Sequence, residues 1–147
     1  MTLKETVFAD MKTAMREKDS IKLETIRMLR AAIQRKEVDD RVELDDQAVL
    51  QVVQKMVKQC TDAATQFSAG GRHDLVAREN ANIAVLEYYL PAKLSDQEVD
   101  DLVGQAVEQA GATSMKDMGK VVGLLKLSLQ GRADMGVVSA KVKSLLS

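Results

Sequence analysis

Residue types on which many enzymes depend are scarce in this chain. Its 147 residues include one cysteine, one histidine and one proline, and no tryptophan. A single cysteine excludes an internal disulfide, and one Cys with one His cannot supply the usual ligand set of a zinc site. Every Ser-His-Asp or Cys-His arrangement would have to use His73, and that residue lies far in sequence from any candidate nucleophile. We therefore expect no catalytic residues, no metal and no cofactor, with His73 at the surface near a helix start.

Long apolar runs and aromatic side chains are also missing. No apolar run approaches the roughly 20 residues that a membrane-spanning helix needs, and Lys4 and Glu5 interrupt the stretch where a signal peptide would carry its apolar region. We therefore expect a soluble, cytoplasmic protein with no membrane partner. Aromatic residues make up 3% of the chain, which predicts a core of Leu, Val, Ile and Met and disfavours recognition of RNA by base stacking.

The near-neutral net charge of −1 conceals two regions of opposite sign. Residues 92–109 carry one Lys against five Asp and Glu, a net charge of −4. Residues 115–147 carry six Lys and Arg against two Asp, a net charge of +4. A polyanion would therefore meet a local basic patch rather than a uniformly basic surface.

Apolar residues recur at helical intervals from the start of the chain. Thr2 and Glu5 form a predicted capping box, followed by an inward stripe of Leu3, Val7, Phe8, Met11 and Met15. Asp19 and Ser20 mark a break and a new cap. The second helix directs Leu23, Ile26, Leu29 and Ile33 inward, and its other faces are basic. These faces carry five basic residues and one acidic residue, Glu24, which indicates either a solvated surface or a second basic strip. The basic residues are Lys22, Arg27, Arg30, Arg35 and Lys36.

The third and fourth helices are predicted from caps and breakers. A charged loop at residues 37–43 precedes Asp45, which can cap a long helix with a seam of Val49, Val53, Met56, Cys60, Ala63 and Phe67. We interpret Cys60 as a small core hydrophobe rather than a reactive thiol. Gly70-Gly71 stops this helix. The next begins near residues 72–74 and should end near Leu90, because the residue before Pro91 is disfavoured in the helical region.

Beyond Pro91 the pattern predicts three short helices. Ser95 and Glu98 form a second capping box, and Gly111 ends that helix. Thr113 or Ser114 should cap the next helix, Gly131 should end it, and Asp134 should cap the last. The sequence thus predicts an all-α fold, with a helical N-terminal domain of antiparallel hairpins at residues 1–90. A small three-helix C-terminal bundle follows at residues 91–147.

Gly119 and Gly123 interrupt the middle helix of that bundle, where each costs about 1 kcal/mol relative to Ala. Such a cost is tolerated where another backbone comes close. One interpretation is close helix packing within the bundle; the other is approach by a phosphate backbone, with positive charge from Lys120, Lys126 and Arg132. The two are compatible. Adjacent carboxylates such as Asp39-Asp40 and Asp100-Asp101 point to different sides of a helix and suit caps rather than Mg²⁺ or glycosidase chemistry.

These motifs resemble the YqeY-like proteins (the GatB/YqeY group). The resemblance lies in residues 118–123, in Gly131-Arg132-Ala133-Asp134, and in the segment Tyr89 to Ser95 around Pro91. Two N-terminal segments fit as well, Ile26-Arg27-Met28-Leu29 and residues 69–75 with their Gly70-Gly71 pair. The resemblance covers essentially the whole chain. The C-terminal part is similar to the tail domain of the B subunit of the tRNA-dependent glutamyl/aspartyl-tRNA amidotransferase.

The resemblance implies an all-helical fold and a role in holding tRNA. The chain has no counterpart to the part of the B subunit that activates the carboxylate with ATP and Mg²⁺. What carries over is the recognition role, on Gly119, Lys120, Gly123, Lys126 and Arg132. We expect a stand-alone, non-catalytic tRNA-binding adaptor. The alternatives are a protein-interaction module, docking on an amidotransferase or an aminoacyl-tRNA synthetase, and an accessory component with carbon–nitrogen ligase activity that uses glutamine as amido donor.

Overall fold

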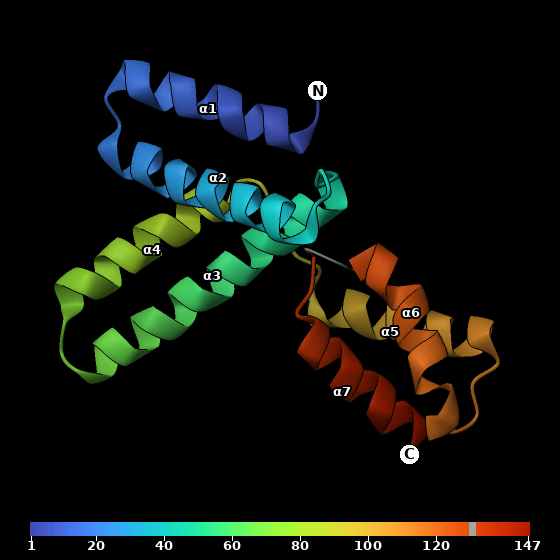
Figure 1. Cartoon of the computed structure of the whole chain (residues 1–147). Coiled ribbons are helices and arrows are strands. Elements are labelled where there is room, and N and C mark those ends of the chain that lie inside the picture. Colours follow the sequence, from blue (N-terminus) through green and yellow to red (C-terminus); the bar gives the residue numbers. More distant parts are fainter. Residues whose placement is uncertain (130–131) are drawn as a thin grey trace. The chain divides into compact units, whose positions relative to one another are not determined.

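The computed structural model describes residues 1–129 and 132–147, and within these residues every regular element is a helix (Figure 1). The prediction of an all-α fold is therefore confirmed. Contacts divide the chain into two compact units, unit 1 at Met1–Leu90 and unit 2 at Pro91–Ser147. Each unit has its own hydrophobic core. No helix among the described residues is long and apolar enough to cross a membrane.

Unit 1 opens with two antiparallel helices joined by a tight turn (Figure 1). The first, α1 (Leu3–Glu17), begins with the predicted capping box, in which Thr2 accepts from the Glu5 N–H and the Glu5 carboxylate accepts from the Thr2 N–H. Lys18 ends α1 in the left-handed conformation, with φ of 56°. Asp19 then caps α2 (Ser20–Asp40), as predicted. The turn is short because one residue ends the first helix and the next one starts the second.

The second helix runs further than the sequence indicated. Residues 37–40, predicted to lie in a loop, form the last turn of α2. The Glu37 carboxylate accepts from Lys4 Nζ at 2.7 Å and from the Leu44 N–H at 2.9 Å. These two hydrogen bonds hold the end of α2 to α1 and to the segment that follows it. Tertiary contacts thus extend the helix past the point where local charge favoured a loop.

The next two helices form a long hairpin (Figure 1). Asp45 caps α3 (Asp46–Ala69) as predicted, and Gly70-Gly71 ends it, with Gly71 at φ of 74°. The fourth helix, α4 (His73–Glu87), ends three residues earlier than the predicted end at Leu90. Residues 88–90 form a turn instead, and in it the Tyr89 hydroxyl donates to Asp10 Oδ2 at 2.7 Å. This contact ties the end of the hairpin to α1.

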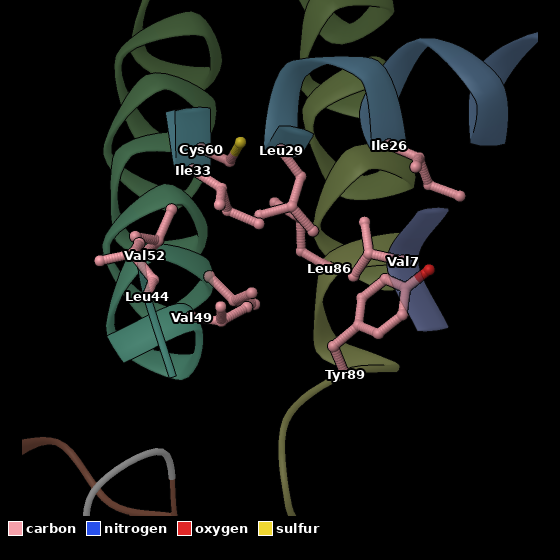
Figure 2. Close-up of a cluster of buried hydrophobic side chains, with 11 residues drawn as sticks. Val7, Ile26, Leu29, Ile33, Leu44, Val49, Val52, Cys60, Leu86 and Tyr89 are labelled. Carbon is pink, nitrogen blue, oxygen red and sulfur yellow. The ribbon is translucent and has the colours of Figure 1, made fainter. Parts of the chain in front are cut away.

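The core of unit 1 draws side chains from all four helices (Figure 2). Cys60 lies among them with 8% of its surface exposed, which confirms its interpretation as a core residue. The predicted stripe on α1 is wrong in two positions. Phe8 and Met15 are exposed, whereas Val7 is buried as predicted, and Ala14, which was not in the predicted stripe, is buried as well. The buried residues of this cluster are Val7, Ile26, Leu29, Ile33, Leu44, Val49, Val52, Val53, Cys60, Leu86 and Tyr89.

Unit 2 packs three helices around a core of Val, Leu and Ala. The capping box of Ser95 and Glu98 opens α5 (Asp96–Ala110), and Gly111 ends it at φ of 62°, both as predicted. A 3-10 turn, η1 (Met115–Asp117), leads into α6 (Met118–Leu129). Asp134 caps α7 (Met135–Leu146), as predicted. The core residues are Val99, Val103, Ala106, Val121, Leu125, Leu129, Val138, Val142 and Leu146.

Two predictions about the ends of α6 have different outcomes. Ser114 precedes η1 and makes no capping hydrogen bond with its side chain. The side-chain contact at this end comes from Asp117, whose Oδ2 accepts from the Thr113 N–H at 3.1 Å. The predicted cap by Thr113 or Ser114 is therefore wrong, because a carboxylate inside the turn reaches back to the backbone. Gly131, predicted to end this helix, lies outside the described residues.

Candidate functional site

The two glycines of α6 lie on its exposed side. A Cβ added to Gly119 or to Gly123 would meet no atom of the described residues within 4 Å. The interpretation that these glycines allow close helix packing inside the bundle is therefore wrong. Their cost to the helix, about 1 kcal/mol each, is not offset by any close approach within the described part of unit 2. The other interpretation, approach by a molecule from outside, stays a prediction.

The orientation of α6 follows from its own apolar spacing. Val121, Leu125 and Leu129 recur every four residues and are buried at 0%, 3% and 0% exposure. Residues that lie about half a turn from this row must face outward. Gly119 and Gly123 occupy that outer side, and Leu124 beside them is 40% exposed. The exposed side of α6 therefore lacks side-chain bulk at Gly119 and at Gly123, one helical turn further on.

Lys120 is exposed but has one internal contact. Its Nζ donates to the Ala110 carbonyl oxygen at 3.2 Å, at the last residue of α5. A cation at this end of a helix is favourable, because the last carbonyl groups of the helix lack backbone partners and carry partial negative charge. The ammonium group has three donors, so this bond leaves others for a ligand. Lys120 therefore stands at a fixed place beside the glycines.

Lys126 lies on the same exposed side of α6, since it follows Gly119 by seven residues. It makes no ion pair with any described residue. Lys116, four residues before Lys120, is also exposed and was not among the predicted site residues. Lys116 lies in η1, the 3-10 turn that precedes α6.

Arg132 is placed differently from the other four predicted residues. It follows α6, and its carbonyl oxygen accepts from the Leu94 N–H at 2.9 Å. The Glu98 pKa is lowered mainly by hydrogen bonds from Ser95 at the start of α5, and the positive charge of Arg132 adds to this. Arg132 is half-buried and lies near an acidic residue. The structure thus groups Gly119, Lys120, Gly123 and Lys126 on α6 and holds Arg132 against the segment that precedes α5.

One other basic residue of unit 2 is engaged elsewhere. Lys141 on α7 pairs with Asp100 on α5 at 2.5 Å, and this hydrogen bond raises the pKa of Lys141. The acidic start of α5 is thus partly neutralised within the unit. The exposed side of α6 has no comparable acidic partner among the described residues, and its positive charge faces solvent.

Groups suited to catalysis do not gather in the described part of the chain. No set of three or more His, Cys, Asp or Glu side chains there could hold a metal ion. His73 is exposed at the first residue of α4, where the sequence placed it. The neighbouring Arg72 and Asp74 pair with each other at 3.1 Å. Among the described residues, the candidate site is therefore the exposed side of α6.

Comparison with known proteins relates nearly the whole chain to one family. Residues 4–146 match the model of the Yqey-like protein family. A curated relative from Pyrenophora tritici-repentis, "Altered inheritance of mitochondria protein 41, mitochondrial", is 32% identical over 142 residues, covering 94% of this chain and 77% of that protein. A protein of the same name from Meyerozyma guilliermondii is 32% identical, covering 85% and 71%. One from Vanderwaltozyma polyspora is 27% identical, covering 92% and 77%.

These names contradict the expected cytoplasmic location. Each of the three relatives is named as a mitochondrial protein, which points to mitochondria rather than to the cytoplasm. The expectation rested on the composition and on the absence of apolar runs. Those features describe how a chain interacts with water and lipid, and they do not specify the compartment in which it resides.

Proposed function

This chain belongs to the Yqey-like protein family, and from that premise we propose that it is a stand-alone, non-catalytic adaptor that binds tRNA through the exposed side of α6. The observation that carries the proposal is the Gly119 and Gly123 pair, which has open space above it and lysines on the same side. The family resemblance supplies tRNA as the ligand. The names of the relatives support mitochondria as the place of action.

The proposed mode of binding is recognition of backbone and shape. Glycine lacks a Cβ, so a phosphate group can approach the helix backbone at two successive turns. Lys120 and Lys126 supply positive charge to phosphate oxygens on either side of that approach. Unit 2 contains no aromatic residue on which a base could stack. Contacts with phosphates and ribose hydroxyls of the double-helical parts of tRNA would therefore provide the affinity, with little dependence on base sequence.

Salt dependence provides the first test. Filter binding of total tRNA is measured at several salt concentrations for the unaltered protein and for K120A/K126A. The double variant should bind more weakly, and its salt slope should fall by roughly 0.7–0.9 for each phosphate that it no longer neutralises. The matched control is K55A/K58A, which removes two exposed lysines from α3 in unit 1. An unchanged slope in K120A/K126A, or an equal weakening in the control, would contradict the proposal.

The glycines allow a second test that does not alter charge. Replacing both with glutamine, in G119Q/G123Q, places long side chains over the backbone where the phosphates are expected. We expect tRNA binding to weaken by roughly tenfold, about 1.4 kcal/mol, while the helical content is maintained. G104Q on α5 is the control, since a Cβ there also meets open space. Full binding by G119Q/G123Q would show that nothing approaches this side of α6 closely.

A further inference from the structure

A second exposed surface lies on unit 1, on the side of α1 that the sequence placed in the core. Phe8 and Met15 are 38% and 49% exposed, and Met1 is 87% exposed. Phe8 and Met15 are seven apart on α1, an interval that returns to nearly the same side of a helix, and Met1 lies just before that helix begins. Val7 and Ala14, one position earlier, already fill the core. Phe8 and Met15 therefore form an apolar row on α1 that the fold of unit 1 does not bury.

A groove runs beside this row, between α1 and α2. Its volume is about 620 Å³, within the usual range for ligand-binding clefts of roughly 300–1,000 Å³. Val7 and Ile33, both core residues, also line it, and Phe8 and Met1 lie along it. A groove between two antiparallel helices with apolar residues along one edge matches the shape of a third helix.

Two cations are held at the edge of this groove by the ring of Phe8. The Arg30 Cζ lies 4.3 Å from the ring centroid and the Lys12 Nζ lies 4.6 Å from it. Arg30 Nη1 also approaches the Met11 sulfur at 3.4 Å. Neither Lys12 nor Arg30 pairs with a carboxylate among the described residues. Their charges are fixed in place by an aromatic ring and are not neutralised.

The acidic groups at the same groove are already engaged. Glu37 accepts from Lys4 and from the Leu44 N–H, and these bonds lower the pKa of Glu37. Glu5 takes part in the capping box of α1. Among the charged residues that line the groove, Lys12 and Arg30 are thus the two cations that no described carboxylate neutralises. The surface is therefore basic as well as apolar.

From this combination we propose that the groove between α1 and α2 binds an amphipathic helix of a partner protein that carries acidic residues beside its apolar row. Apolar side chains of that helix would pack against Phe8, Met15 and the groove. Its carboxylates would pair with Lys12 and Arg30. A groove that runs between two antiparallel helices suits a third helix, whose apolar side chains recur on one face every three to four residues. RNA is less well suited, because the two cations occupy positions over the Phe8 ring that a stacked base would need.

The proposal does not depend on tRNA binding by unit 2, and it is tested with the full chain. Two designed helical peptides of about three heptads share one apolar row and differ only in the flanking residues, which are Glu in one and Lys in the other. Binding is measured by fluorescence anisotropy at low and moderate salt. We expect the glutamate peptide to bind roughly tenfold more tightly than the lysine peptide, with the difference shrinking as salt rises.

Reversing the charges of Lys12 and Arg30 tests whether these two residues contact the peptide. In K12E/R30E the preference should invert, so that the lysine peptide binds more tightly than the glutamate peptide. K55E/K58E makes the same charge change at exposed residues of α3 and should keep the original preference. F8Q, which removes the ring that positions both cations, should weaken binding of the glutamate peptide. Circular dichroism of each variant verifies that the helices are intact.

Three results would overturn the inference. The first is that neither peptide binds the unaltered protein, or that both bind equally. The second is that K12E/R30E keeps its preference for the glutamate peptide. The third is that binding of total tRNA, or of vesicles containing anionic lipid, depends on Lys12 and Arg30 while peptide binding does not. That last result would assign the surface to a nucleic acid or to a membrane.

Discussion

At the scale of single residues, neighbouring groups decide what each reactive side chain can do. The Cys60 thiol lies in the core of unit 1, and burial there raises its pKa to about 11, with a further contribution from the carboxylate of Glu79. The reactive form of cysteine is the thiolate, and it is disfavoured wherever burial removes its hydration. Cys60 is therefore a packing residue in a position where its chemistry is suppressed.

This environment predicts slow labelling of Cys60. In the folded protein, reaction with a thiol reagent at pH 8 should be far slower than in denaturant, where the pKa returns to its ordinary value near 9. The proton is bound more tightly in the folded state, so the associated stability is present below pH 9 and is lost between pH 9 and 11. The measurement is the labelling rate against pH, with and without urea. Equal rates in both states at pH 8 would show that the thiol is not buried.

At the scale of elements, each helix has a covered side and an open side, and the open sides carry the proposed functions. On α1 the open side holds Phe8 and Met15, and on α6 it holds Gly119 and Gly123. The two surfaces differ in character. The first has exposed bulk with cations around it, which suits packing against another helix. The second lacks side-chain bulk at its two glycines, which suits close approach to the helix backbone there.

The exposed glycines also predict an effect on stability. G119A and G123A should each raise the free energy of unfolding, by about 0.5–1 kcal/mol, because alanine loses less backbone entropy in a helix and meets open space here. Urea denaturation followed by circular dichroism measures the change. G104A on α5 should give a similar increase, since it also meets open space. Destabilisation by G119A or G123A alone would mean that a neighbour lies closer than the structure places it.

At the scale of the whole molecule, the chain has two cores and one proposed surface on each. Pro91 stands at the boundary between the two units. A boundary in sequence between two cores suggests that each unit holds together through its own contacts. We propose on this basis that the units can act separately, one toward an acidic helix and the other toward tRNA.

Separate expression of residues 1–90 and 91–147 tests this arrangement. Each fragment should be helical by circular dichroism, with the glutamate peptide bound by the first fragment and tRNA by the second. The shorter fragment should unfold at lower denaturant concentration, because small domains bury a smaller fraction of their surface. The control is an equimolar mixture of the two fragments, which should reproduce both activities of the full chain. A fragment that unfolds alone but folds in the mixture would show that the units depend on each other.

The sequence predicted the starts of helices better than their ends and their covered sides. The caps at Thr2, Asp19, Asp45, Ser95 and Asp134 were all identified correctly. The end of α2 was placed too early, since hydrogen bonds of Glu37 with Lys4 and Leu44 extend it. The end of α4 was placed too late. In the candidate site, four of the five predicted residues share α6, whereas Arg132 follows that helix and contacts the segment before α5.

The amino-acid sequence alone determined that this protein is helical, where most helices begin, and which residue types are too scarce for metal or triad chemistry. Caps and helical periodicity act over a few neighbouring residues, so they can be recognised without knowing the rest of the fold. Only the tertiary structure decided that Phe8 is exposed beside the buried Val7, and that no described residue covers Gly119 and Gly123. Burial depends on which helices, distant in sequence, pack against a given helix. The apolar pattern of one helix is compatible with more than one buried side.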